Sequence, residues 1–161
     1  EFFIKFKKTL LSCSSSPLIL KVIFFLKLNF IFGLANSCKL IVLKIKLVGP
    51  IYGENLAGIY QLAKVMAYPS MFEGFGYPIL EAMRLGTPVL TSNVSSMPEA
   101  GGDAAHYVNP ESLDEIKTGL CKLLNDQNYR KFLADKGTRH AESFSTMRMT
   151  RETLEVYRKI T

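Results

Sequence analysis

The sequence predicts an α/β domain built on a Rossmann-like parallel sheet flanked by helices. Short apolar segments of four or five residues alternate with longer segments in which apolar residues recur at helical spacing. Strands this short and uniformly apolar are typical of parallel sheets buried between helices. The chain has 161 residues, which is the size of one domain of ordinary length.

The predicted strands share an apolar composition and end at glycine, proline or polar residues. They are residues 45–49, 65–68, 88–91 and 104–108. The predicted helices are residues 55–64, 78–85, a segment that begins after Ser112, 129–143 and 146–160. In the first of them apolar residues recur at helical spacing, and the segment after Ser112 carries its apolar residues on one side. Pro78 suits the start of a helix and Gly86 suits its end. Ser112 followed by Glu115 predicts a capping box.

Charge is unevenly distributed along the chain. Residues 1–50 hold eight lysines and one acid, whereas residues 51–161 hold twelve basic and thirteen acidic residues. The net charge of +6 therefore belongs to the first third, which argues against a nucleic-acid-binding role for the whole chain. The three cysteines are far apart, which predicts free thiols in a reducing compartment. Neither histidine has neighbours at metal-ligand spacing, so we expect no metal site.

Residues 1–44 differ in character from residues 45–161, so we treat them as a separate Lys- and Phe-rich apolar segment. Within it, residues 17–35 approach the roughly 20 residues of a membrane span. Lys21 and Lys27 interrupt that run, and a central lysine costs about 2.5–3.5 kcal/mol on insertion scales. Three interpretations stay open: an artefact of a misassigned gene start, a membrane-associated segment, or a divergent strand and helix. The expected location is the cytoplasm, with the cytoplasmic membrane face as the alternative.

The segment 69–83 carries the strongest indication of function. It places two carboxylates, Glu73 and Glu81, on either side of a glycine-containing loop that follows a predicted buried strand and precedes a predicted helix. Helix N-termini bind anions through free backbone N–H groups, and glycines allow a ligand to approach the backbone. Two acids beside an anion site suit hydroxyl groups on the same ligand. Phosphate together with hydroxyl groups indicates a sugar nucleotide.

From residue 46 to the end, the chain resembles a known family. Glu73 to Met83 is similar to the family's E-x7-E signature, and Gly86-Thr87-Pro88-Val89 and Ser92 to Glu99 continue the match in order. Gly102-Asp103-Ala104-Ala105, Asn109-Pro110 and Phe144-Ser145 follow. The family is that of the retaining GT-B glycosyltransferases, glycosyltransferase family 4 (glycosyl transferases group 1). The resemblance covers the C-terminal, donor-binding half of the GT-B fold.

The resemblance implies a role for each position of the signature. Glu73 would be the catalytic residue beside the reacting carbon of the transferred sugar, and Glu81 would accept hydrogen bonds from the ribose hydroxyls. Ile79 and Leu80 would pack the helix and frame the nucleoside. The remaining donor-binding positions would contact the sugar and the distal phosphate: Gly74, Phe75, Gly76 and Tyr77. Independently of the resemblance, Glu81 falls in the first turn of the helix predicted from Pro78, where the helix dipole would stabilise it by about 0.3–1 kcal/mol.

The resemblance also implies the reaction and its partners. A nucleotide-diphospho-sugar, of GDP-mannose or UDP-hexose type, would donate a hexose with retention to a sugar or lipid-linked acceptor, without a bound metal or other cofactor. The family's Arg and Lys phosphate clamp has no match in residues 1–44, and the N-terminal acceptor domain is missing from this sequence. We therefore expect the isolated chain to be an inactive fragment.

Two other classes remain open on the sequence alone. Two carboxylates could act as the acid and base of a glycoside hydrolase, although one lies over a loop and the other in a helix. Alternatively, the chain could be a non-catalytic scaffold or binding protein attached to a membrane through residues 17–35.

Overall fold

The computed structural model describes residues 22–24 and 50–160 and shows a four-stranded parallel sheet. Its strands are β1 (Val22–Phe24), β2 (Val65–Tyr68), β3 (Val89–Ser92) and β4 (His106–Val108), and they lie side by side in chain order. In the register, Met66 lies opposite Val89, and Leu90 lies opposite His106. The predicted α/β class with a parallel sheet is confirmed.

Three of the predicted strands lie among the described residues, and each is found within two residues of its expected bounds. The strand expected at 45–49 lies outside the described residues. β1 comes from the segment 17–35, and its backbone pairs with β2 from Val22 opposite Val65 to Phe24 opposite Ala67. The remainder of residues 1–44 lies outside the described residues.

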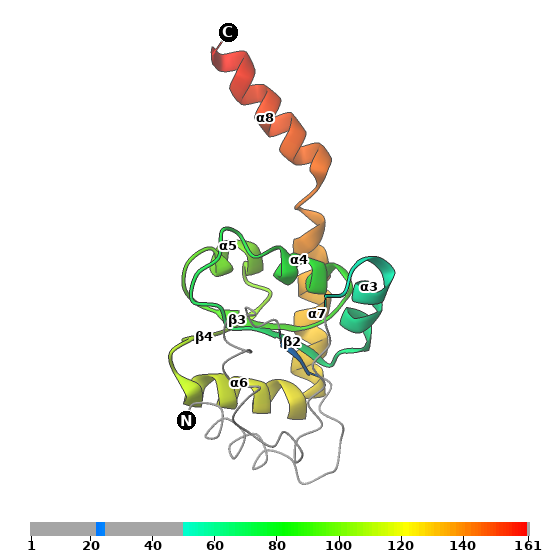
Figure 1. Cartoon of the computed structure of the whole chain (residues 1–161), viewed down its shortest axis with the longest axis vertical. Helices are drawn as coiled ribbons and strands as arrows, with labels where there is room; N and C mark the ends of the chain where they lie inside the picture. Colours follow the sequence, from blue (N-terminus) through cyan, green and yellow to red (C-terminus); the bar gives the residue numbers. More distant parts are fainter. Residues whose placement is uncertain (1–21, 25–49, 161) are drawn as a thin grey trace.

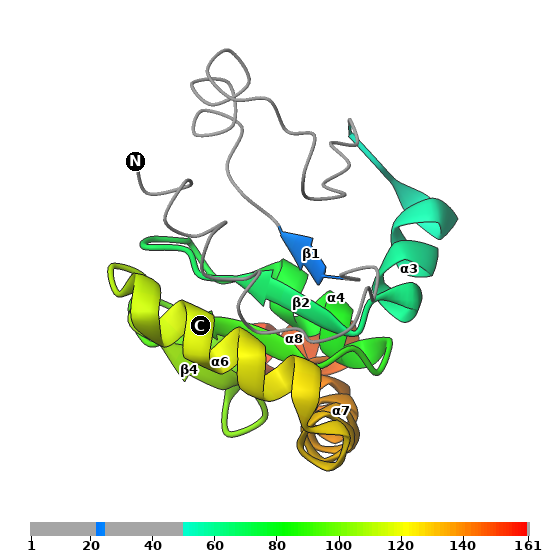
Figure 2. The ribbon, with the colours of Figure 1, turned by 90° about the horizontal axis from the view of Figure 1, so that it is seen from below.

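The helices are α3 (Gly53–Leu62), α4 (Tyr77–Arg84), α5 (Met97–Gly101), α6 (Leu113–Asn125), α7 (Gln127–Glu142) and α8 (Thr146–Ile160). Figure 1 shows α4 and α5 on one side of the sheet and α6 on the other, and Figure 2 shows α6 and α7 from below. Successive side chains of β2 point to opposite faces. Met66 therefore packs in the core under α4, whereas Val65 and Ala67 pack with Leu120 of α6.

Helices α4 and α7 are in close contact. A Cβ on Gly137 would lie 3.0 Å from Cγ of Met83, so glycine lets the two backbones approach. The hydroxyl of Thr138 donates a hydrogen bond to the Met83 carbonyl over 3.2 Å. Arg84, at the end of α4, donates to the carbonyls of Ala141 and Phe144 over 3.2 and 2.9 Å. These contacts fix the direction of α4, which carries Glu81.

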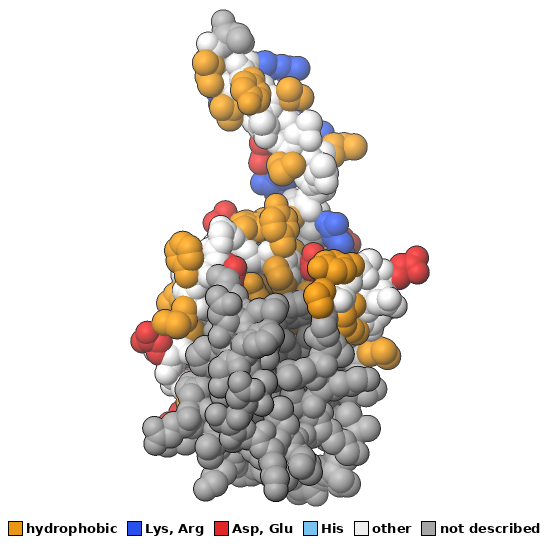
Figure 3. Space-filling view, in the orientation of Figure 1, with side chains coloured by type: hydrophobic (Ala, Val, Ile, Leu, Met, Phe, Trp, Pro, Cys, Tyr) orange, Lys and Arg blue, Asp and Glu red, His pale blue; other side chains and the backbone are white. Residues whose placement is uncertain are grey.

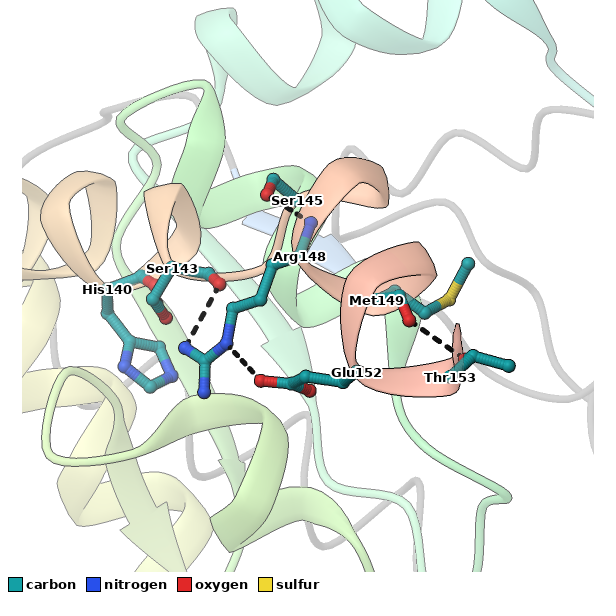
Figure 4. Close-up of polar contacts among 7 residues, drawn as sticks. All are labelled: His140, Ser143, Ser145, Arg148, Met149, Glu152 and Thr153. Atoms are coloured by element: carbon teal, nitrogen blue, oxygen red, sulfur yellow. Dashed lines mark hydrogen bonds and ion pairs between the residues drawn. The ribbon is translucent and has the colours of Figure 1, made fainter. Parts of the chain in front are cut away.

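Helix α8 extends away from the rest of the domain, and none of its residues is buried (Figures 1 and 3). Its start is organised locally, because the hydroxyl of Ser145 accepts the N–H of Arg148 over 3.2 Å. Arg148 also forms an ion pair with Glu152 one turn later, with Nε 2.7 Å from the carboxylate (Figure 4). The apolar side chains of this helix are exposed: Met147, Met149, Leu154, Val156, Tyr157 and Ile160.

The structure differs from the sequence prediction in two local features. Helix α5 was not predicted, and it places Glu99 in its first turn. The capping box is half right: Ser112 accepts the N–H of Glu115 over 3.3 Å, but the Glu115 carboxylate accepts the N–H of Asn109 over 2.8 Å. The N–H of Ser112, which a complete box would bond to Glu115, donates instead to the Asn109 carbonyl over 3.0 Å.

Cysteine chemistry and membrane association were also expectations from the sequence. Cys121 is disulfide-bonded, so the expectation of a free thiol is wrong for this residue. Its partner is not among the described residues. Within residues 22–24 and 50–160, no helix has the length and apolar character needed to cross a bilayer. Most of the segment 17–35, to which membrane association was assigned, lies outside the described residues.

Candidate functional site

The predicted site lies at the carboxyl ends of β2 and β3. The loop 69–76 joins β2 to α4, and the loop 93–96 joins β3 to α5. Because parallel strands end at the same edge of a sheet, these two loops meet there. Hydroxyl groups join the strand ends: Thr91 donates to the Tyr68 carbonyl over 2.9 Å, and Ser92 donates to the Ser70 carbonyl over 2.5 Å. The site is therefore built from two connected loops.

The backbone of Glu73 is held by two serines of the neighbouring loop. Ser95 and Ser96 both donate from Oγ to the Glu73 carbonyl, over 3.1 and 2.9 Å. The N–H of Glu73 lies 3.4 Å from Oγ of Ser95. Among the described residues, Ser95 is the only residue other than glycine with positive φ, at 57°. A left-handed conformation of a serine is unfavourable, so the loop accepts strain at the residue that contacts Glu73.

The carboxylate of Glu73 is half-buried and accepts hydrogen bonds from hydroxyl groups. Ser70 donates from Oγ to Oε1 over 2.8 Å. Burial, together with a hydrogen bond to Glu73 and its negative charge, raises the pKa of the Tyr68 phenol, so that group is a donor at neutral pH. Glu73 is thus oriented through both its backbone and its side chain.

The two glycines of the loop differ in what the fold demands of them. Gly76 has φ of 103°, and a Cβ there would lie 3.2 Å from Cδ1 of Ile79, so the fold itself requires glycine. Gly74 has no positive φ, and a Cβ there would meet nothing within 4 Å. Gly74 is exposed, and nothing in the described structure requires it. A requirement for glycine at this position would have to come from a ligand.

The loop presents backbone donors at the start of α4. Within the described part of the chain, the N–H groups of Gly74, Phe75 and Gly76 donate no hydrogen bond, and no side chain caps α4. Unpaired N–H groups at a helix start attract anions, and the helix dipole adds to this attraction. Phe75 is half-buried and lies 5.3 Å from the Tyr77 ring and 5.9 Å from the Phe144 ring, centroid to centroid. Phe75 therefore anchors the loop, while the Tyr77 side chain is 66% exposed.

Glu81 does not lie in the first turn of its helix, where the sequence predicted it. Helix α4 begins at Tyr77, with Pro78 in its second position, so Glu81 falls in the second turn and the predicted dipole stabilisation is wrong. Instead, its carboxylate Oε2 accepts a hydrogen bond from the Tyr60 hydroxyl over 3.1 Å. The Glu81 side chain is exposed, whereas Ile79 and Leu80 are buried and pack α4 on the core. The two carboxylates thus have separate hydrogen-bond partners.

Three features of the site were not assigned from the sequence: the serine contacts of Ser95 and Ser96, and the Tyr60 donor. The serines form a hydroxyl-rich run after a predicted strand, a signal that could have been read. Tyr60 precedes Glu81 by 21 residues, and only the fold brings the two together.

Neither a cluster of metal ligands nor a hollow in the surface points to a second site in the described ranges. In the described ranges, no three His, Cys, Asp or Glu side chains lie together as metal ligands would. An open hollow of about 710 Å³ lies where α6 meets α7, lined by residues such as Lys122 and Asp126. None of the predicted donor-binding residues lines it.

Comparison with known proteins identifies relatives of this chain. Residues 34–140 match the family described as glycosyl transferases group 1. The chain is 39% identical over 114 residues to O-antigen chain mannosyltransferase B of Escherichia coli, covering 71% of this chain and 30% of that protein. It is 37% identical over 110 residues to the MMP alpha-(1->4)-mannosyltransferase of Mycolicibacterium hassiacum, covering 66% of this chain and 27% of that protein. The chain therefore spans less than a third of these relatives.

Solved structures agree with this match. The sucrose-phosphate synthase of Thermosynechococcus elongatus is similar with a TM-score of 0.66 and 27% identity, over 71% of this chain and 30% of that chain. A glycosyltransferase from Rickettsia africae shares the fold, with a TM-score of 0.55 and 18% identity over 67% of this chain and 30% of that chain.

Proposed function

Because the chain belongs to the glycosyl transferases group 1 family, we propose that its β2–α4 junction binds a nucleotide-diphospho-sugar. The observation that carries this proposal is the loop 73–76: a carboxylate fixed by serines stands beside backbone N–H groups without a partner in the described protein. Gly74 adds open space at the same place. Anion donors and a hydroxyl acceptor on one loop suit a sugar joined to a diphosphate.

Each part of the donor has a proposed partner. The N–H groups of Gly74, Phe75, Gly76 and Tyr77 face the sugar and the distal phosphate. Glu73 accepts hydrogen bonds from sugar hydroxyls near the anomeric carbon. Glu81 accepts hydrogen bonds from the ribose hydroxyls, and Ile79 and Leu80 hold α4 against the core so that Glu81 stays in place.

The chemical logic of the site is electrostatic. Transfer breaks the bond between the anomeric carbon and a diphosphate oxygen, so negative charge grows on the leaving diphosphate while the sugar gains oxocarbenium character. Fixed N–H donors that face the diphosphate stabilise that charge. Glu73, held in place through its carbonyl and carboxylate, orients the sugar ring. In the proposed reaction the hexose is transferred with retention, and no metal or cofactor takes part.

The donor and acceptor are proposed from the relatives. Two relatives are named as mannosyltransferases, which favours mannose as the sugar and a GDP-mannose or UDP-hexose type of donor. The acceptor is a sugar or lipid-linked glycan, presented by an acceptor domain outside the region described above. We further propose that residues 45–161 bind donor without transferring it on their own, at the cytoplasmic side of the cell. The hydrolase interpretation is not retained, because the family is one of transferases.

The test is donor binding by the purified chain, measured by calorimetric titration with GDP, UDP, GDP-mannose and UDP-glucose. We expect saturable binding of one nucleotide and tighter binding of its sugar conjugate. Glu81→Gln should weaken binding of the nucleotide by about tenfold to a hundredfold, since a hydrogen bond to a charged group is worth about 1.5–3 kcal/mol. Glu73→Gln should weaken only the sugar conjugate.

Glu155→Gln is the matched control, because Glu155 is exposed on α8, which extends away from the rest of the domain. It should bind as the unmodified chain does. If no nucleoside diphosphate binds at millimolar concentration, or if both acid variants bind unchanged, the proposed function is wrong.

A further inference from the structure

Tyr60 connects the hydrophobic core to the proposed nucleotide site. Its side chain is 1% exposed, near the end of α3, yet its hydroxyl reaches Glu81 Oε2 over 3.1 Å. Its backbone carbonyl accepts a hydrogen bond from the Thr87 hydroxyl over 2.7 Å, in the turn between α4 and β3. Tyr60 is therefore fixed at both ends, and both contacts are made with the segment that contains Glu81.

The electrostatic surroundings keep this phenol a donor. Burial, together with the charge of Glu81 and the hydrogen bond to it, raises the pKa of Tyr60 well above its ordinary value. The phenol is therefore protonated at any pH at which the protein would work, and it offers its proton to Oε2. Glu81 itself is exposed, and its carboxylate accepts the hydrogen bond from Tyr60.

An exposed glutamate on a helix normally samples several rotamers. A ligand that binds only one of them loses affinity, because binding must restrict the side chain to that rotamer. A hydrogen bond from a buried, immobile phenol selects one orientation in advance. The oxygen that Tyr60 does not engage is then available to a ligand. This arrangement resembles the supporting contacts that hold the ligating groups of other sites.

We propose that Tyr60 is a positioning residue that orients Glu81 toward ribose hydroxyls and so contributes to the preference for ribonucleotide donors. This inference rests on the proposed function, because it presumes that Glu81 reads the ribose. It extends that function by assigning specificity to a residue of the core that does not touch the donor. A purely structural role for Tyr60 would predict no effect on the choice between ribose and deoxyribose.

The test compares binding of GDP with binding of 2′,3′-dideoxy-GDP, by calorimetric titration of the full chain; UDP and dideoxy-UDP replace them if the chain prefers uridine. We expect the unmodified chain to prefer the ribonucleotide by about tenfold. Tyr60→Phe removes only the hydroxyl, and it should lower that preference by about threefold to tenfold while the ring still fills the core. Glu81→Gln should abolish the preference, and the double variant should be no worse than Glu81→Gln alone, since the two residues act as one unit.

Tyr107→Phe is the matched control. Tyr107 is half-buried, and its hydroxyl also donates a hydrogen bond within the protein, to the Gly102 carbonyl over 2.6 Å. No hydrogen bond joins it to Glu73 or Glu81. Its removal should leave the preference for ribose unchanged. A readout without substitution uses the ¹³Cζ resonance of Tyr60 in labelled protein, which should shift on addition of GDP and not of dideoxy-GDP. This readout also holds if Tyr60→Phe does not fold.

The outcomes separate the two ideas. If the unmodified chain binds neither nucleotide, the proposed function fails and this inference fails with it. If it binds both equally, nucleotide binding stands, but Glu81 does not read the ribose and the role of Tyr60 is overturned. If the preference for ribose depends on Glu81 but is unchanged in Tyr60→Phe, with no ¹³Cζ shift, the proposed function stands and the role of Tyr60 is overturned.

Discussion

Ser96 donates a hydrogen bond from Oγ to the carbonyl oxygen of Glu73 over 2.9 Å, across two loops that are 23 residues apart in the chain. The contact joins the loop after β3 to Glu73, the residue that we propose to lie beside the transferred sugar. It means that the position of Glu73 depends on the loop that leads into α5. The first prediction follows from this dependence.

Ser96→Ala should weaken binding of the sugar conjugate more than binding of the nucleotide alone. A neutral hydrogen bond contributes about 0.5–1.5 kcal/mol, which corresponds to roughly twofold to tenfold in affinity. Thr153→Ala is the control, because the Thr153 hydroxyl also donates to a carbonyl, that of Met149 over 2.8 Å, but on α8, which extends away from the rest of the domain. Equal losses for GDP and GDP-mannose, measured by titration calorimetry, would contradict a role for Ser96 in placing Glu73.

Alanine at the two loop glycines should separate folding from binding. Gly76→Ala should lower the free energy of unfolding by about 1–3 kcal/mol, because φ of 103° is unfavourable for alanine and its Cβ crowds Ile79. Gly74→Ala should leave stability within about 0.5 kcal/mol, because its Cβ points into open space. It should nevertheless weaken donor binding, since that space is where we place the ligand.

Urea unfolding and donor titration of both variants check this prediction. A stable Gly74→Ala variant that binds donor normally would show that the open space is not used by the ligand.

Acidification should destabilise the fold through His106. This histidine begins β4, and its Nδ1 lies 3.0 Å from the Tyr129 hydroxyl. Burial and the charge of Lys122 lower its pKa below the ordinary value of 6.5, so the folded protein holds the neutral form. The unfolded chain binds the proton more readily. The stabilisation from neutral His106 is therefore complete above pH 6.5 and declines as the pH falls toward the lowered value.

His106→Gln should flatten this pH dependence. We expect the difference in melting temperature between pH 7.5 and pH 5.5 to shrink in the variant, as measured by circular dichroism. Gln127→Ala, at an exposed position at the start of α7 with no ionisable side chain, is a control that should keep the pH profile of the unmodified chain. An identical pH profile for His106→Gln would refute the assignment.

The regular elements could be predicted because one-dimensional patterns determine them. β2 was predicted at its observed bounds from four consecutive apolar residues, and α8 was also predicted at its observed bounds. Helix α5 could not, because it has only five residues, contains Pro98 and ends at glycine, so it resembles a turn in sequence. Capping depends on the path of the chain before the helix, which is why Glu115 bonds Asn109 rather than completing the box.

The same distinction applies to the candidate site: its motif residues could be predicted from the sequence, but the residues that hold them in place could not. Glu73, Glu81 and the loop glycines belong to one contiguous segment, so a motif could find them. Their partners belong to other elements: Tyr60 to α3, and Ser95 and Ser96 to the loop after β3. No local pattern reports such contacts, because they exist only once the strands are in register.

The last prediction concerns Phe144, which links the glycine loop to the end of α7. Its ring lies 5.9 Å from Phe75 and 5.2 Å from His140, and its carbonyl accepts a hydrogen bond from Arg84. Phe144→Leu should lower the free energy of unfolding by about 1–2 kcal/mol, because a half-buried aromatic contact is lost. It should also weaken donor binding, because Phe75 anchors the loop through this ring.

Phe132→Leu is the matched control for that substitution. Phe132 is 56% exposed on α7, so its replacement should change stability by less than about 0.5 kcal/mol and leave binding unaltered. Urea unfolding measures the first effect and titration with the sugar nucleotide the second. If Phe144→Leu lost stability yet bound donor as tightly as the unmodified chain, the ring would support the fold without supporting the loop, and Glu73 would owe its position to the serines alone.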